Sequence, residues 1–559
     1  MPQGTTTERA TTGGILAPLR DHPTFRTIWA ANLVSGLGTL VQGVGAAWLM
    51  TQLAGTPDQV ALVQTAMLAP ILLFAPLAGA LADTFDRRRV LIAAQLWMIA
   101  ASTALAALTV LGAVGPGLLL LLTFALGTGA ALNGPAWQAA VRDIVPGRDL
   151  AASVTLNAIA FNMARAVGPA LGGLLVAAYG AQSAFAVNAV SSFAMIAAML
   201  AWRRDPPRAD LPRERLGHAV IAGLRYARET PLIRRILLRA GVFGFLAAAV
   251  MALLPLVARD RLGGGASLYG LLLGAFGVGA LAGAFVIHPL RQARGAEFVV
   301  TLLTGVFGGA MLVVGLMPQV LPVALALPLA GAAWLGSFST FNISVQMSTA
   351  PWVQARVLAI YQTVVFGGMA VGSWAWGQVA HQLGLDLTHV VVGALFLASL
   401  ALHLRARLPS AEQIPDLGPL ASRLEDPKPT LRFDFGQGPI LVLVEYRVPE
   451  ANTAAFVEAM EEVGHLRRRD GAWRWDLFED VGDPTLWFET FTLDSWFEYL
   501  RQRRRGTAGD EAAIARARAL LDPGFQPVVR RMVHRGSDAA AGTAAEAPAG
   551  REGVAVGSS

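Results

Sequence analysis

Long apolar segments separated by short polar turns fill the chain from Phe25 to Leu404. Each apolar run is about 20 residues or longer, enough for a helix to cross the roughly 30 Å hydrocarbon core of a bilayer. Dividing the pattern at its turns predicts twelve membrane spans. These are residues 25–52, 57–82, 89–112, 116–142, 149–178, 181–202, 233–257, 266–288, 297–316, 320–349, 354–382 and 386–405.

The positions of the arginines predict which way the spans run. Alternate turns are rich in arginine, as at Arg87 to Arg89 and at Arg203 and Arg204, whereas the turns between them carry almost none. Arginine-rich turns stay in the cytoplasm. We therefore expect a multi-pass protein of the cytoplasmic (inner) membrane with both termini in the cytoplasm. One turn on the other side, Arg259-Asp260-Arg261, departs from this rule.

An internal repeat predicts two similar halves. Leu77-Ala78-Gly79-Ala80 recurs about 204 residues later as Leu281-Ala282-Gly283-Ala284. Two parallel repeats of six helices explain this, with the substrate path between them. The expected membrane region has a cytoplasmic segment (1–24), a first bundle (25–203), a cytoplasmic linker (204–231) and a second bundle (232–405).

A second, smaller domain follows the last span. Residues 406–437 are polar and rich in proline, which indicates a linker. Residues 438–536 show the order β-α-β-β-α-β of a ferredoxin-like α+β domain. The tail, residues 537–559, is rich in Ala, Gly and Ser and is expected to be disordered. The predicted fold class is an all-α polytopic membrane protein, with two pseudo-symmetric six-helix bundles and this small domain.

Composition agrees with a membrane protein and excludes several kinds of chemical site. Hydrophobic residues make up 54% of the chain and charged residues 15%, against about 25% charged in soluble proteins. The chain has no cysteine, which excludes disulfides, thiolate catalysis and cysteine metal sites. It also has no Gly-x-x-x-x-Gly-Lys-Ser/Thr motif for ATP. We expect no catalytic set, metal, cofactor or nucleic-acid partner.

The turn after the second predicted span carries a distinctive motif. Its glycine, carboxylate and arginines are spaced as in the signature loop of the major facilitator superfamily, which the sequence here resembles, although Thr84 and Asp86 depart from the common form. The resemblance implies that these residues latch the two halves and gate transport; the alternative is that the arginines only set topology. The residues concerned are Gly79, Asp83, Arg87 and Arg88.

The fifth predicted span is interrupted by Gly168-Pro169-Ala170-Leu171-Gly172-Gly173. Proline kinks a helix, and small residues let a neighbouring helix approach closely. The segment is similar to the core of a motif in drug–proton antiporters of the superfamily, although its upstream glycine is replaced by Ala164. Gly168, Pro169, Gly172 and Gly173 are thus assigned to a kink or antiport-like motif, and tight packing alone is the alternative.

Polar side chains inside the spans are candidates for substrate binding or coupling. An ionisable group at membrane depth indicates function by default, and amides beside aromatic rings suit an amphiphilic substrate; interhelical hydrogen bonding is the alternative. No carboxylate lies at mid-membrane depth, so proton coupling is implied by the resemblance alone. The candidates are Gln42, Asn157, Asn162, Arg165, Asn342, Gln346, Tyr361 and Gln362.

Further segments indicate a closer likeness within the superfamily. The run Asn133-Gly134-Pro135-Ala136-Trp137-Gln138 and the later Gly168-Pro169 resemble its enterobactin-exporter-like branch. The small domain, with Arg469-Asp470-Gly471-Ala472-Trp473, resembles dimeric α/β barrels of the antibiotic-biosynthesis-monooxygenase type, which implies that it could dimerise.

The resemblance implies a secondary transporter that works by alternating access in the lipid bilayer. It would export hydrophobic or amphiphilic small molecules, drug-like or siderophore-like, by proton antiport. Two alternatives stay open at this point. One is uptake of a metabolite, and the other is a membrane-tethered, monooxygenase-like enzyme that acts through the C-terminal barrel.

Overall fold

The computed structural model describes residues 16–53, 56–84, 86–202, 216–408 and 433–535, with isolated positions between 417 and 431. Most of the expected N-terminal segment, much of both linkers and the tail from residue 537 lie outside the described residues. The chain forms two compact units, a helical membrane domain and a smaller C-terminal domain.

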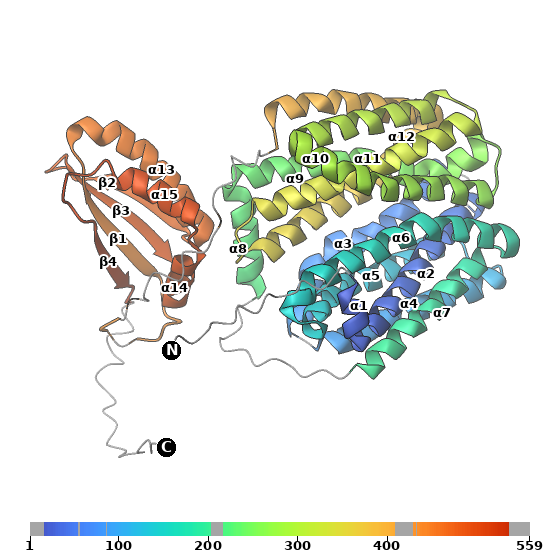
Figure 1. Ribbon diagram of the computed structural model, residues 1–559, viewed down its shortest axis with the longest axis horizontal. Helices are drawn as coiled ribbons and strands as arrows, with labels where there is room; N and C mark the ends of the chain where they lie inside the picture. Colours follow the sequence, from blue (N-terminus) through green and yellow to red (C-terminus); the bar gives the residue numbers. More distant parts are fainter. Residues whose placement is uncertain are drawn as a thin grey trace, which may run out of the picture. The chain divides into compact units, whose positions relative to one another are not determined.

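The membrane domain is built from helices. The first group is α1 (Ala17–Asp21), α2 (Pro23–Leu53), α3 (Pro57–Thr84), α4 (Arg87–Val110), α5 (Pro116–Ile144), α6 (Gly147–Tyr179) and α7 (Ala181–Ala201). The second group is α8 (Leu216–Glu229), α9 (Pro231–Leu256) with a π-helical turn (Val257–Arg261), α10 (Ala266–Leu316), α11 (Val320–Met347) and α12 (Gln354–Arg405). Figure 1 shows α2 to α7 gathered in one bundle and α9 to α12 in a second bundle beside it.

Local sequence explains where many of these helices begin. Pro23, Pro57, Pro116 and Pro231 are each the first residue of a helix. Proline suits this position because its fixed φ is helical and the first amides of a helix have no partner to lose. Asp86, at the place where related loops carry glycine, caps α4, and its carboxylate accepts a hydrogen bond from the Arg88 amide at 2.8 Å.

Two glycines divide the longest helices. Straight helices of 51 and 52 residues, the lengths of α10 and α12, would extend for about 75 Å, more than twice the membrane core. Gly295 in α10 has φ 82° and Gly384 in α12 has φ 80°, a left-handed conformation that glycine adopts without steric cost. Both glycines lie where the sequence predicts a turn between spans.

The described residues contain nine helices that are long and apolar enough to cross a membrane. This confirms a polytopic, mostly helical membrane protein. The count of twelve spans stays a prediction, since two of the nine helices are the divided helices α10 and α12.

The C-terminal domain has an antiparallel sheet with helices on one face. Its elements are β1 (Ile440–Arg447), a short 3-10 turn (Glu450–Asn452), α13 (Thr453–Asp470), β2 (Arg474–Glu479), β3 (Leu486–Leu493), α14 (Trp496–Arg505), α15 (Ala508–Arg518) and β4 (Val528–Val533). The strand order is β2-β3-β1-β4, so β3 lies between the two strands that α13 connects. This is the split β-α-β arrangement of a ferredoxin-like sheet, as the sequence predicts.

Buried and more exposed residues alternate along the central strands, and this alternation explains the core of the domain. Val442, Val444 and Phe491 are buried on one face with Phe456 and Met460 of α13, whereas the residues between them along the strands point to the other face. Two aromatic residues that the sequence places in the linker extend this core at Trp496. Phe433 and Phe435 lie 5.7 and 6.3 Å, ring centre to ring centre, from Trp496.

The segment from Arg469 to Trp473, which carries the likeness to the dimeric barrels, has a structural role here. The Arg469 guanidinium donates to the carboxylates of both Asp470 and Asp510, at 2.8 and 2.6 Å. Gly471, with φ 147°, ends α13. Burial raises the pKa of Asp470 to about 6 even though Arg469 opposes this shift. The motif therefore ties the end of α13 to the start of α15.

A buried carboxylate lies between the sheet and α13. Glu489 of β3 has no exposed side-chain surface, and it accepts hydrogen bonds from Tyr446, Arg467 and Trp475 at 2.8, 3.0 and 3.1 Å. Burial and the neighbouring Glu489 carboxylate raise the pKa of Tyr446 well above its ordinary value, so its hydroxyl stays a donor. Glu489 thereby links β1, β2, β3 and α13.

We predict that Glu489→Gln loosens this domain. Glutamine keeps an acceptor but leaves the Arg467 charge without its counter-ion, which costs about 2 kcal/mol. In the purified full-length protein, the amides of β1 and β3 should exchange hydrogen for deuterium faster. Glu445→Gln, on the opposite face of β1, is the matched control. Equal exchange in the two variants would contradict the central role of Glu489.

Candidate functional site between the two bundles

The glycine motif of α6 lies where the two bundles touch. A Cβ atom built on Gly172 would come within 3.1 Å of Val41 in α2, and one built on Gly173 within 2.5 Å of the Gly270 Cα in α10. The first position is tight and the second has no room for a side chain, and the second contact joins the first bundle to the second. Pro169 lies inside the same helix. Close packing is therefore the immediate role of this motif.

Earlier in α6, about two turns before Gly172, a cation contacts an aromatic ring of the other bundle. The guanidinium carbon of Arg165 lies 3.9 Å from the ring centre of Trp334 in α11. Trp334 in turn packs against Phe338 and Phe276, with ring centres 4.8 and 6.2 Å away. A desolvated cation–π contact of this kind contributes on the order of 2 kcal/mol. Arg165 thus lies on an aromatic cluster at the contact between the bundles.

A second seam between the bundles runs along α3 and α12. Asp58 Oδ1 lies 3.2 Å from Nδ1 of His381, and the Thr65 hydroxyl donates to the Ala370 carbonyl at 3.0 Å. A Cβ atom on Gly377 would come within 2.6 Å of Ala61. We call the end of the bundles that carries Asp58, the start of α10 and Gly384 the Asp58 end.

Two arginines strengthen the Asp58 end. The Arg259 guanidinium donates to the carbonyl of Thr51, at the end of α2 in the other bundle. Arg261 donates to the Gly315 carbonyl at 2.7 Å and lies 3.1 Å from Asp386, so it caps the end of α10. These contacts give a structural reason for the arginines that depart from the charge rule. The bundles are closed against each other at the Asp58 end.

The signature loop lies at the opposite end of the first bundle. Arg87 donates to Asp143 at 2.5 Å, joining α4 to α5, and Arg88 donates to the Leu200 carbonyl of α7 at 2.8 Å. Gly79 and Asp83 belong to α3 by their backbone, but the surroundings of Gly79 and the side chain of Asp83 lie outside the described part of the structure. The two arginines therefore brace neighbouring helices of one bundle.

The other polar candidates do not form one cluster. Gln42 accepts from Ser102 at 3.0 Å and also from Asn188, inside the first bundle. The Tyr361 hydroxyl donates to the Phe338 carbonyl at 2.9 Å, inside the second bundle. These three contacts are interhelical hydrogen bonds, the alternative left open by the sequence.

The remaining amides lie in varied surroundings. Gln346 donates to Asn342 at 2.5 Å along one face of α11, and Gln362 is exposed on α12. The side-chain amide oxygen (Oδ1) of Asn157 is buried and has no hydrogen-bond partner among the described residues. The Asn162 side chain lies outside the described part of the chain. Arg165 is the candidate that the structure connects across the two bundles.

Sequence reasoning missed the partners of these residues. Trp334 and His381 carry no motif, and 169 and 323 residues separate them from Arg165 and Asp58. The only local signals are that Trp334 is an aromatic residue in a span with many small residues, and that His381 is an ionisable residue near the end of a span. Among the described residues, no three His, Asp or Glu side chains are arranged to hold a metal ion.

Known proteins resemble the chain over most of its length. The uncharacterized MFS-type transporter YfiS of Bacillus subtilis is 25% identical over 68% of this chain and 92% of its own. The multidrug efflux pump Tap of Mycolicibacterium fortuitum is 26% identical over 65% of this chain and 90% of its own. The enterobactin exporter EntS of Citrobacter koseri is 26% identical over 72% of this chain and 98% of its own.

A solved structure has the same fold. A bacterial homologue of the human lysosomal transporter Spinster, in an inward-facing, unoccupied conformation, superposes with a TM-score of 0.55 at 13% identity. The match covers 69% of this chain and 96% of that one.

The family match extends through both units of the chain. Residues 13–539 match the MFS_3 family, described as transmembrane secretion effectors, so the match includes the C-terminal domain as well as the bundles. Together with the fold and the contact between two bundles, this shows that the chain belongs to the MFS_3 family of major facilitator transporters.

Proposed function

We propose that this transporter exports hydrophobic or amphiphilic small molecules, drug-like or siderophore-like, across the cytoplasmic membrane. The observation that carries the proposal is Arg165 on the Trp334 ring, at the contact between the bundles. A cation beside aromatic rings recognises molecules that are apolar and also carry acidic or electron-rich groups. The efflux pump and the siderophore exporter among the relatives support the same substrate class.

We propose that the Asp58 end faces outward and that both termini lie in the cytoplasm. The arginine-rich turns at the opposite end support this orientation, because such turns stay in the cytoplasm. Closure between α3 and α12 and between α6 and α10 then makes the Asp58 end the outer gate. Alternating access would require this seam to separate.

The motifs receive their roles within this cycle. We propose that Gly79, Asp83, Arg87 and Arg88 stabilise the state closed to the cytoplasm. Proton antiport is proposed from the likeness of Gly168, Pro169, Gly172 and Gly173 to the antiporter motif. The remaining candidates for substrate or coupling are Gln42, Asn157, Asn162, Asn342, Gln346, Tyr361 and Gln362.

Dimerisation through the C-terminal domain is also proposed. The sheet face away from α13 carries Phe478, Val528 and Met532, whose exposed fractions are 49%, 44% and 40%. A second copy of this domain would cover that apolar surface, as the likeness to the dimeric barrels implies.

The first test is accumulation in cells that lack their own pumps. We expect this protein to lower the accumulation of some fluorescent drugs or siderophores, and collapse of the proton gradient to restore it to the control level. Unchanged export after uncoupling would contradict proton antiport. Higher accumulation would indicate uptake, and no change across a broad panel would contradict the proposed substrate class.

Asp83→Asn tests the gating motif. The neutral amide cannot attract arginine as a carboxylate does, so most transport should be lost while the amount of protein in the membrane stays normal. Asp86→Asn is the matched control, because asparagine is an equally good helix cap and should leave transport unchanged. Wild-type flux in Asp83→Asn would contradict the latch.

A cysteine pair tests the outer gate, since the natural chain has no cysteine to interfere. Asp58→Cys with His381→Cys should be joined by a short thiol cross-linker added from outside, and joining should stop transport until the link is cleaved. Asp58→Cys with Gln362→Cys is the control, because 19 residues of helix separate Gln362 from His381 by about 28 Å. Free transport in the cross-linked first pair would contradict the gate.

A further inference from the structure

A basic cavity lies in the second bundle, away from the contact between the bundles. It has a volume of about 1000 Å³ and opens where α9 begins, where α12 ends, and just beyond the Gly295 break in α10. Its polar lining consists of Arg235, Glu297, Thr301, His403, Arg405 and Arg407. None of these residues has a role in the proposed transport path.

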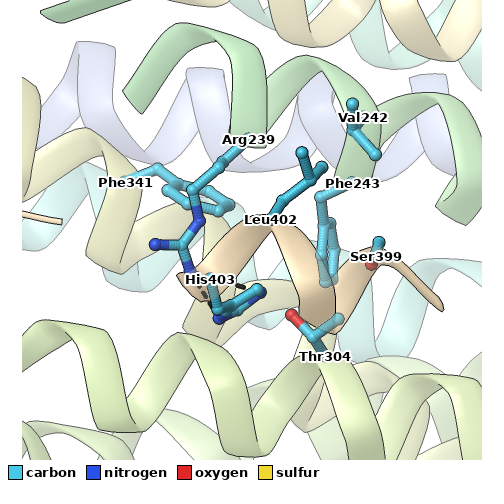
Figure 2. Close-up of a pocket in the computed structure, with 8 residues that line it drawn as sticks. All are labelled: Arg239, Val242, Phe243, Thr304, Phe341, Ser399, Leu402 and His403. Carbon is cyan, nitrogen blue, oxygen red and sulfur yellow. Dashed lines mark hydrogen bonds between the residues drawn. The ribbon is translucent and has the colours of Figure 1, made fainter. Parts of the chain in front are cut away.

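A network of buried polar groups forms one wall of this cavity. Arg239 of α9 donates to Glu297 at 2.5 Å and lies 2.7 Å from Nδ1 of His403 in α12. Glu297 also accepts from the Leu408 amide at 2.7 Å. Figure 2 shows the Arg239 side chain extending toward His403, with Thr304 nearby. The Glu297 charge is therefore already neutralised, and this wall holds α9, α10 and α12 in place.

The rim of the cavity carries three more arginines. Arg235, Arg405 and Arg407 are exposed, and within the described ranges their guanidinium groups form no ion pair or hydrogen bond. With Arg239 counted, four arginines face one glutamate, which leaves an excess of three positive charges. A guanidinium is planar and can bind a phosphate group through two parallel hydrogen bonds. The rim therefore matches a phosphate rather than a cation.

Apolar surface adjoins these arginines on the same cavity. Leu404, next to Arg405 at the end of α12, lines the cavity and is 74% exposed. Leu238 of α9 does not line the cavity, but it lies three residues after Arg235 and is 53% exposed. On a membrane-spanning helix, exposed leucines contact lipid tails. A ligand that fits both features has a phosphate beside a hydrocarbon chain, which a free phosphate ion lacks.

We propose that this cavity binds the phosphate headgroup of an anionic phospholipid of the surrounding bilayer. Arg235, Arg405 and Arg407 would contact the phosphate, and the acyl chain would lie along Leu404. Basic pockets between helices at a membrane surface are suited to such headgroups. The lipid would join the start of the second bundle to its end.

Lipid binding to the purified full-length protein tests this proposal without any transport readout. Vesicles that contain phosphatidylcholine with a small fraction of labelled phosphatidylglycerol serve as the probe. Replacing Arg235, Arg405 and Arg407 with Gln should weaken the retention of phosphatidylglycerol by about tenfold or more, since each guanidinium contributes its charge and also a charge-assisted hydrogen bond to the phosphate. These side chains are exposed, so the variant should elute from a sizing column as the wild type does.

The matched control removes equal charge outside the cavity. Arg234 lies at the start of α9, and Arg291 and Arg294 lie just before the Gly295 break in α10, but none of them lines the cavity. Their replacement with Gln removes the same surface charge without removing a phosphate contact, so it should weaken retention clearly less than the cavity variant does. An equal loss in both variants would show a general surface charge and overturn the site. Displacement of the lipid by millimolar inorganic phosphate would show a free-phosphate site instead. Unchanged retention in the cavity variant would also overturn the proposal.

Discussion

Close approach of helix backbones at the contact between the bundles is the constraint on which the rest of this structure depends. In a bilayer, apolar surface gains little by burial, because lipid tails are as apolar as leucine, so helices associate by tight packing and hydrogen bonds. Gly173 against Gly270 and Gly377 against Ala61 supply that packing. The contacts of Arg165 with Trp334 and of Asp58 with His381 form only because the backbones already lie this close.

The charged groups are arranged to limit the cost of placing them in or near the membrane. Arg165 lies over an aromatic ring, Arg87 pairs with Asp143, and Arg239 pairs with Glu297. The three contacts are of two kinds. The first joins the two bundles, so movement of the bundles would change it. The other two connect helices within one bundle, so a rigid-body movement would leave them intact.

The C-terminal domain follows the physics of soluble proteins instead. Its sheet has alternating residues, a hydrophobic core under α13 and one buried carboxylate with three donors. The sequence predicted the order of its strands and helices and its ferredoxin-like arrangement. It missed that Phe433 and Phe435 belong to the packing around Trp496, because two aromatics in a proline-rich segment show no periodicity.

The sequence by itself determined the elements and the class of protein. Span length follows from apolar runs, helix starts from Pro23, Pro57, Pro116 and Pro231, and the breaks at Gly295 and Gly384 from the turns around them. Each of these is a local property of the chain. Only the tertiary structure decided which polar groups meet: Gln42 bonds inside its own bundle, whereas Arg165 reaches Trp334. Such pairs depend on the register between helices distant in the chain, and the hydrophobic pattern that specifies each helix leaves that register open.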